Sequence, residues 1–230
     1  MKTDTRENFK DAFNFVKVAL MSPKKNYAEA KAHAEKLDHL LNFGCQGIER
    51  ELFEKHRRNP PITSQQFWFG LDLQSLQTPY SEIVEMVQHL NPQPGQLWVD
   101  LGAGYGRIGI VLGFLCPLVQ FLGFEIVRER VNESNRVFQE WKLNLAKMKQ
   151  DDISTEFFSI GFADLYFIYD FGSKKDVYQV LEKLKIIAKT QPIRIIARGR
   201  GVRNWIFIDF PWLHEIHRPE HFLNWSLFRS

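Results

Sequence analysis

The sequence predicts an α/β fold in which helices cover both faces of a mostly parallel β-sheet, giving three layers. The first observation is a unit of strand, turn and helix. An apolar run at 97–101 leads into three alternating glycines, and helically spaced apolar residues follow as far as residue 115. The second observation is that short apolar runs then alternate with amphipathic stretches up to residue 197. This alternation is typical of parallel sheets, because each crossover places a helix on one face.

The turn after the first strand is suited to holding a small ligand. Gly102, Gly104 and Gly106 can adopt positive φ and let a ligand approach the backbone closely. The helix behind them offers unpaired N–H groups and the positive end of its dipole. The spacing is G-x-G-x-G, whereas the dinucleotide fingerprint is G-x-G-x-x-G. An acid, Asp100, stands two residues before the first glycine.

The second apolar run, 119–125, ends in Glu125, about 20 residues beyond the glycine turn. At this distance a nucleotide-binding sheet places a carboxylate on ribose hydroxyls, and a carboxylate can accept both hydroxyl protons. A glutamate at a strand end can also be solvated or cap the next helix. The glycine turn at the matching distance favours ribose binding by Glu125.

Residues 97–107, Leu-Trp-Val-Asp-Leu-Gly-Ala-Gly-Tyr-Gly-Arg, closely resemble motif I of the class I S-adenosylmethionine-dependent methyltransferases. The resemblance covers about 76–230 and implies a Rossmann-like, seven-strand sheet with a terminal antiparallel hairpin. It also implies S-adenosyl-L-methionine as the cofactor. The residues expected to bind it here are Asp100, Gly102, Ala103, Gly104, Gly106, Glu125 and Ile126.

The third strand, 145–150, is followed by Asp151 and Asp152. Members of the family that this chain resembles commonly carry Gly-Asp at this point, where the acid meets the adenine amino group. Asp152 matches that acid, while Asp151 replaces the glycine. The resemblance therefore implies that Asp152 contacts adenine, and the alternative is an aspartate that only shapes the turn.

Thr78 and Pro79 open the helix that precedes the first strand, with Thr78 as the expected N-cap and Pro79 in the first turn. In class I methyltransferases that act on protein side chains, an element of this kind folds over the methionine end of the cofactor. The resemblance therefore implies that Thr78 or Tyr80 contacts the cofactor.

The fourth strand ends in Tyr169-Asp170-Phe171-Gly172-Ser173, where a substrate would enter. Methyltransferases that act on nucleobases or glutamine usually carry Asn/Asp-Pro-Pro-Tyr/Phe here, and this chain has no proline at that place. The loop resembles that of the protein-lysine branch. We expect Tyr80, Tyr169 and Phe171 to form an apolar slot that favours a neutral lysine amine, with Asp170 accepting a hydrogen bond from it. The alternative is that Tyr169 and Phe171 only pack the sheet.

Residues 1–75 are interpreted as a helical cap and linker, with helices at 4–21 and 26–57, the second of them bent or broken at Gly44. They carry no catalytic signature. At the other end of the chain, Trp205–Leu213 and Asn224–Phe228 are expected to complete the final hairpin. Residues 198–203, rich in Arg and Gly, are interpreted as a turn beside the substrate cleft, with a nucleic-acid patch as the alternative.

The composition permits one sizeable α/β domain with an appendage: 230 residues, 44% of them hydrophobic, and a formal charge of +3. Two distant cysteines, the lack of metal-ligand spacing and the lack of a membrane-length apolar run predict a cytoplasmic protein without a metal. We expect a methyltransferase with a protein lysine as acceptor. The alternatives are a small-molecule or RNA methyltransferase, or an inactive cofactor-binding interaction module.

Overall fold

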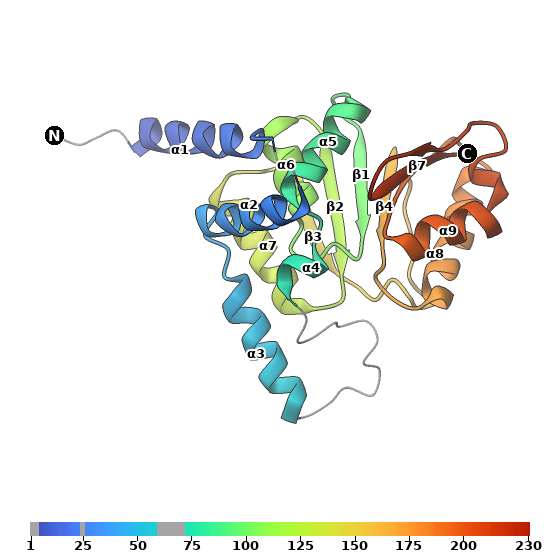
Figure 1. Ribbon diagram of the computed structural model, residues 1–230, viewed down its shortest axis with the longest axis horizontal. Helices are drawn as coiled ribbons and strands as arrows, with labels where there is room; N and C mark the ends of the chain where they lie inside the picture. Colours follow the sequence, from blue (N-terminus) through green and yellow to red (C-terminus); the bar gives the residue numbers. More distant parts are fainter. Residues whose placement is uncertain (1–4, 24–25, 59–71) are drawn as a thin grey trace.

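The computed structural model describes residues 5–23, 26–58 and 72–230, so part of the expected linker lies outside the described residues. Seven strands form one sheet in the order β3-β2-β1-β4-β5-β7-β6 (Figure 1). β1 to β5 pair in parallel, whereas β7 is antiparallel to both of its neighbours. The expected seven-strand sheet with a terminal antiparallel hairpin is therefore confirmed. The strands are β1 (Leu97–Leu101), β2 (Gln120–Glu125), β3 (Ala146–Gln150), β4 (Leu165–Tyr169), β5 (Arg194–Arg198), β6 (Glu220–His221) and β7 (Trp225–Arg229).

Helices cover both faces of the sheet, and side chains of alternate strand residues fill two separate cores. In β4, Phe167 belongs to one core, and Tyr166 and Ile168 belong to the other, as the two-residue period of a strand requires. The N-terminal helices, α5, α6 and α7 pack on the first face, and α8 and α9 on the second. The helices are α1 (Thr5–Leu20), α2 (Tyr27–Leu40), α3 (Cys45–Arg58), α4 (Leu73–Leu76), α5 (Tyr80–Leu90), α6 (Arg107–Leu115), α7 (Arg128–Glu140), α8 (Lys174–Ala188) and α9 (Arg200–Asp209).

The predicted helical N-terminus is confirmed, and the chain breaks close to Gly44. α2 ends at Leu40 and α3 begins at Cys45, and between them Asn42 adopts a positive φ of 59°. Leu37 and Leu41 are buried in the same core as α5 and α6. The N-terminal helices thus share apolar packing with the sheet.

The expected hairpin strand at Trp205–Leu213 is wrong. This stretch lies in α9 and in the 3-10 helix Pro211–Leu213. Val202, Ile206 and Phe210 are buried and recur every four residues, so the apolar period is helical. The hairpin consists of β6 and β7 instead. The stretch interpreted as a turn from Arg198 to Arg203 also differs: Arg198 ends β5, and α9 begins at Arg200.

Candidate functional site

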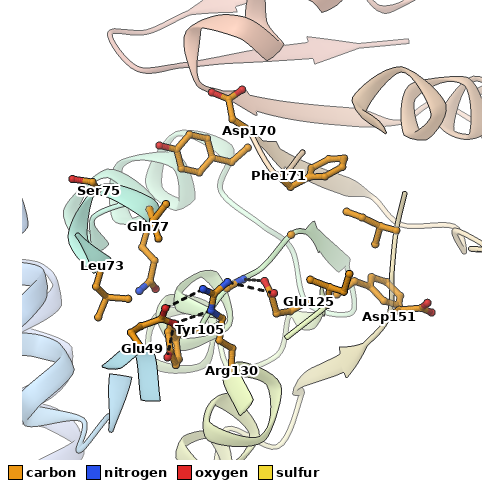
Figure 2. Close-up of a pocket in the computed structure, with 17 residues that line it drawn as sticks. Glu49, Leu73, Ser75, Gln77, Tyr105, Glu125, Arg130, Asp151, Asp170 and Phe171 are labelled. Carbon is orange, nitrogen blue, oxygen red and sulfur yellow. Dashed lines mark hydrogen bonds and ion pairs between the residues drawn. The ribbon is translucent and has the colours of Figure 1, made fainter. Parts of the chain in front are cut away.

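A cavity of about 200 Å³ opens at the carboxyl ends of β1, β2 and β4 (Figure 2). This edge, where β1 has a parallel neighbour on each side, is the place at which open α/β sheets bind ligands. A second cavity of about 50 Å³ adjoins it and shares Leu76, Gln77, Gly102, Gly104 and Tyr169 with it. We call them the large and the small cavity.

The glycine turn forms the floor between the two cavities. Gly102, Gly104 and Gly106 adopt φ of 90°, 54° and 66°, values at which a residue with a side chain would be strained. Gly102 and Gly104 line both cavities, and Ala103 lines the small one. Gly106 lines neither: it precedes α6, and a Cβ there would come within 3.0 Å of Phe138. The structure therefore assigns Gly106 to helix packing rather than to the cavity wall.

Glu125 lies where the sequence predicts, beside the glycine turn. Its Oε2 accepts a hydrogen bond from the Gly104 N–H at 2.9 Å, and its Oε1 accepts one from the Val127 N–H at 3.0 Å. Burial raises the pKa of this carboxyl, while Arg130 and the two N–H groups oppose the rise. Ile126 also lines the large cavity.

An ion-pair cluster that sequence reasoning missed stands next to Glu125. Arg130 on α7 donates to both carboxylate oxygens of Glu49 on α3, at 2.8 and 3.1 Å, and its Nη1 lies 3.6 Å from Glu125 Oε1. The Tyr105 hydroxyl donates to Glu49 at 2.9 Å. Figure 2 shows these side chains gathered on one wall. Only Tyr105, inside the glycine turn, carried a local signal.

The N-terminal helices complete the large cavity. Besides Glu49, it is lined by Leu73, Ser75 and Leu76 on and beside α4. Lys31 on α2 fixes α4 in place, donating to Ser75 Oγ at 2.7 Å and to Asp72 at 3.3 Å. The segment interpreted as a cap without a signature thus supplies part of the wall.

The small cavity combines one acid with unpartnered donors. Asp100 lines it, and burial together with neighbouring Glu125 raises the pKa of Asp100 to about 8. Gln77 is 8% exposed and Arg107 is 4% exposed. Gln77 Nε2 and Arg107 Nε are buried without a hydrogen-bond partner in the described structure. A buried donor without a partner is costly, and a ligand in the small cavity would supply the missing acceptor.

Thr78 and Tyr80, the two residues expected near the methionine end of the cofactor, lie in different places. Thr78 lines the small cavity, although its side chain does not cap α5, for which Pro79 is the N-cap. Tyr80 is fully buried outside both cavities. Its hydroxyl donates to Asp38 on α2 at 2.8 Å, and its ring stacks on the Arg107 guanidinium. The expected place of Tyr80 in the substrate slot is therefore wrong, because the Asp38–Arg107 ion pair holds it behind the glycine turn.

Asp152 shapes a turn and does not line the large cavity. Its Oδ1 accepts hydrogen bonds from the Ser154 N–H at 3.0 Å and from the Ser154 hydroxyl at 2.6 Å. The neighbours Asp151 and Ile153 line the cavity instead. The structure thus shows the turn role of Asp152, and its contact with adenine stays a prediction.

The loop after the fourth strand lies at the large cavity, as expected, because Tyr169, Asp170 and Phe171 all line it. Tyr169 lines both cavities, and Phe171 packs over Gly102, where a Cβ would come within 2.6 Å of Phe171 Cβ. Asp170 also lines the large cavity, but its carboxylate points away from the cavity centre (Figure 2) and lies against Gly199, which precedes α9. Burial raises the pKa of this carboxyl, and the Val202 backbone N–H opposes the rise. Its bond to an incoming amine therefore stays a prediction.

In the described ranges, no three His, Cys, Asp or Glu side chains are grouped closely enough to hold a metal ion. None of the described helices combines the length with the apolar composition that crossing a bilayer requires.

No protein-family model matches the chain, and neither does any curated protein sequence. Solved structures do resemble it. An RNA methyltransferase from Salinibacter ruber, in complex with S-adenosyl-L-homocysteine, is 19% identical, with 66% of this chain and 91% of that one covered and a TM-score of 0.47. The C-terminal domain of precorrin-6Y C5,15-methyltransferase from Rhodobacter capsulatus is 15% identical and has a TM-score of 0.47. The match covers 74% of this chain and 94% of that one. A SAM-dependent methyltransferase from Aquifex aeolicus is 13% identical and has a TM-score of 0.46. The match covers 64% of this chain and 88% of that one.

Proposed function

We propose that this chain is an S-adenosyl-L-methionine-dependent methyltransferase. The observation that carries the proposal is the division of polar groups between the two cavities. Glu125 in the large cavity suits a ribose diol, because its carboxylate accepts hydroxyl protons. Asp100 in the small cavity suits an ammonium, and the orphan donors of Gln77 and Arg107 suit a carboxylate. The cofactor carries these three groups.

A dinucleotide fits the same site poorly. Its pyrophosphate would need free N–H groups at the glycine turn. The Gly104 N–H is already donated to Glu125, and the Gly106 N–H to the Ala103 carbonyl. Asp100, Glu125 and Glu49 line this region, so a pyrophosphate would meet three carboxyl groups. This arrangement favours a cationic cofactor over an anionic one.

When bound, the cofactor supplies a methyl group on a sulfonium, and this chain's residues position and desolvate the acceptor. Tyr169 and Phe171 line the large cavity and would favour a neutral amine by excluding water. A protein lysine remains the acceptor predicted from the sequence. RNA or a small molecule is the alternative acceptor, and Arg200 and Arg203 at the start of α9 favour a nucleic acid.

Titration calorimetry with S-adenosyl-L-homocysteine, NAD and 5′-methylthioadenosine, which lacks the amino-acid part, tests the cofactor. We expect binding of the first and the third but not of NAD. Gln77→Leu should weaken S-adenosyl-L-homocysteine by about 5- to 10-fold, the loss of one hydrogen bond to a charged group, and should leave methylthioadenosine unchanged. The exposed Gln88 on α5 gives the matched control, Gln88→Leu. Tight NAD binding instead would end the proposal.

Turnover distinguishes an enzyme from an inactive binding module. Labelled methyl from the cofactor should reach a protein, a nucleic acid or a metabolite in a cell lysate, and mass spectrometry would identify the acceptor. Cofactor binding without any transfer would favour the module.

A further inference from the structure

Two arginines on the first turn of α9 carry charge that no acid balances. Arg200 is exposed, and no carboxylate of the described residues forms an ion pair with Arg200 or Arg203. Arg203 is fixed by three neutral oxygens: Ser226 Oγ at 2.8 Å and the backbone carbonyls of Leu223 and Phe222 at 3.0 and 2.9 Å. A guanidinium has five N–H donors, so two remain for a ligand.

Arg198, two residues before Arg200, differs from both arginines because its charge is neutralised by an acid. It is buried and donates to both carboxylate oxygens of Glu82, at 2.6 and 3.3 Å. Its guanidinium also lies 4.4 Å from the centre of the Tyr169 ring and so fixes that ring. Arg198 is therefore structural, whereas the charges of Arg200 and Arg203 face the surface.

The two arginines separate two surface hollows. The first is bordered by Tyr27, which is 44% exposed, and by Tyr169, which also lines the large cavity. The second is bordered by Phe207, which is 52% exposed, and by His221. The result is a groove in which positive charge is flanked by aromatic rings. Tyr169 connects the groove to the mouth of the large cavity.

We propose that this groove, centred on Arg200 and Arg203 and flanked by Tyr27 and Phe207, binds a single-stranded nucleic acid that presents the methyl acceptor to the cavity. Arginines along a backbone path with aromatic rings beside it are the features by which proteins bind phosphates and stack unpaired bases. The proposal rests on the proposed methyltransferase function for its acceptor, but the binding can be measured by itself.

The test is fluorescence anisotropy with labelled single-stranded RNA and DNA of mixed sequence, titrated with the full chain between about 50 and 200 mM salt. Arg200→Glu should weaken binding by about tenfold and reduce the slope of log affinity against log salt by about 1. The exposed Arg50 on α3 gives the matched charge reversal, Arg50→Glu, which should change affinity by less than about twofold. The tighter of the RNA and DNA arms identifies the kind of strand.

Three results would overturn the groove: no binding at low salt, equal losses in the Arg200 and Arg50 variants, or tighter binding of polyglutamate than of either nucleic acid. S-adenosyl-L-homocysteine is titrated in parallel and should bind all three proteins equally. If the wild type binds nucleic acid but not this cofactor product, the methyltransferase proposal fails and the groove stands. If it binds the cofactor product but no nucleic acid, the reverse holds.

Discussion

Glu125 and Asp170 occupy equivalent places in the sequence pattern, each at the carboxyl end of a strand beside β1. Glu125 is 6% exposed and faces the glycine turn, with its oxygens held by the N–H groups of Gly104 and Val127. Asp170 is exposed, and its carboxylate lies against Gly199, just before α9, where the Val202 backbone N–H favours its charged form. The strand end alone therefore does not direct a carboxylate into a cavity. The backbone packed around the strand end decides its orientation.

Of the two acids, Glu125 is expected to have the larger effect on cofactor binding when it is replaced. Glu125→Ala should weaken S-adenosyl-L-homocysteine binding by about 1–3 kcal/mol, the range for a lost hydrogen bond to a charged group together with the desolvated partner. Calorimetry measures the affinity, and Glu129→Ala, an exposed acid on the next helix, is the control. Unchanged affinity in a folded Glu125 variant would place the ribose elsewhere.

The second largest effect is expected in the pH dependence of cofactor affinity, through Asp100. Because the pKa of Asp100 is raised from 3.8 to about 8, the empty site holds this carboxyl mostly protonated at neutral pH. A bound ammonium favours the charged form, so cofactor binding should release up to one proton per site. Affinity should therefore rise with pH between about 6 and 8, by at most about tenfold per unit.

Calorimetry in two buffers of different ionisation enthalpy measures that proton, and Asp100→Asn should abolish both the release and the slope. The same shift makes the free energy of unfolding of the empty protein fall as pH rises from about 4 to 8, because the folded state then binds more protons than the unfolded chain. A pH-independent affinity in the wild type would mean that Asp100 does not meet the ammonium.

The smallest effect is expected at Asp170. Asp170→Ala should lower the free energy of unfolding by about 1 kcal/mol, as for the loss of a helix cap, and leave S-adenosyl-L-homocysteine affinity unchanged. Urea denaturation and calorimetry measure the two quantities. If stability is unchanged and methyl transfer is lost, Asp170 acts on the acceptor after all, as the sequence suggested.

Much of the fold could be predicted because its signals are local. The strand, glycine turn and helix at 97–115 follow from adjacent residues, and the two-residue and four-residue periods separate strands from helices elsewhere. The expected strand at Trp205–Leu213 failed where aromatic content outweighed period: Val202, Ile206 and Phe210 bury one helical face, and this spacing was the signal available.

The site was predictable only in part, for the same reason. Gly102, Gly104 and Glu125 are close in the chain or joined by one strand–helix–strand unit. Glu49 and Arg130 are 81 positions apart, and Asp38 and Arg107 are 69 apart. Nothing local in the N-terminal helices indicates that Glu49 would line the large cavity or that Asp38 would hold Tyr80 away from it.

By itself the sequence determined the α/β class, the sheet, the glycine turn and the acid beside it, because backbone freedom and apolar period act within a few residues. Only the tertiary structure decided which helices close the cavities, where the Asp170 and Asp152 carboxylates point and which donors near Asp100 lack a partner. Those outcomes depend on which N–H groups and ions the packing of distant segments brings nearest. The order of the residues does not show which distant segments come into contact.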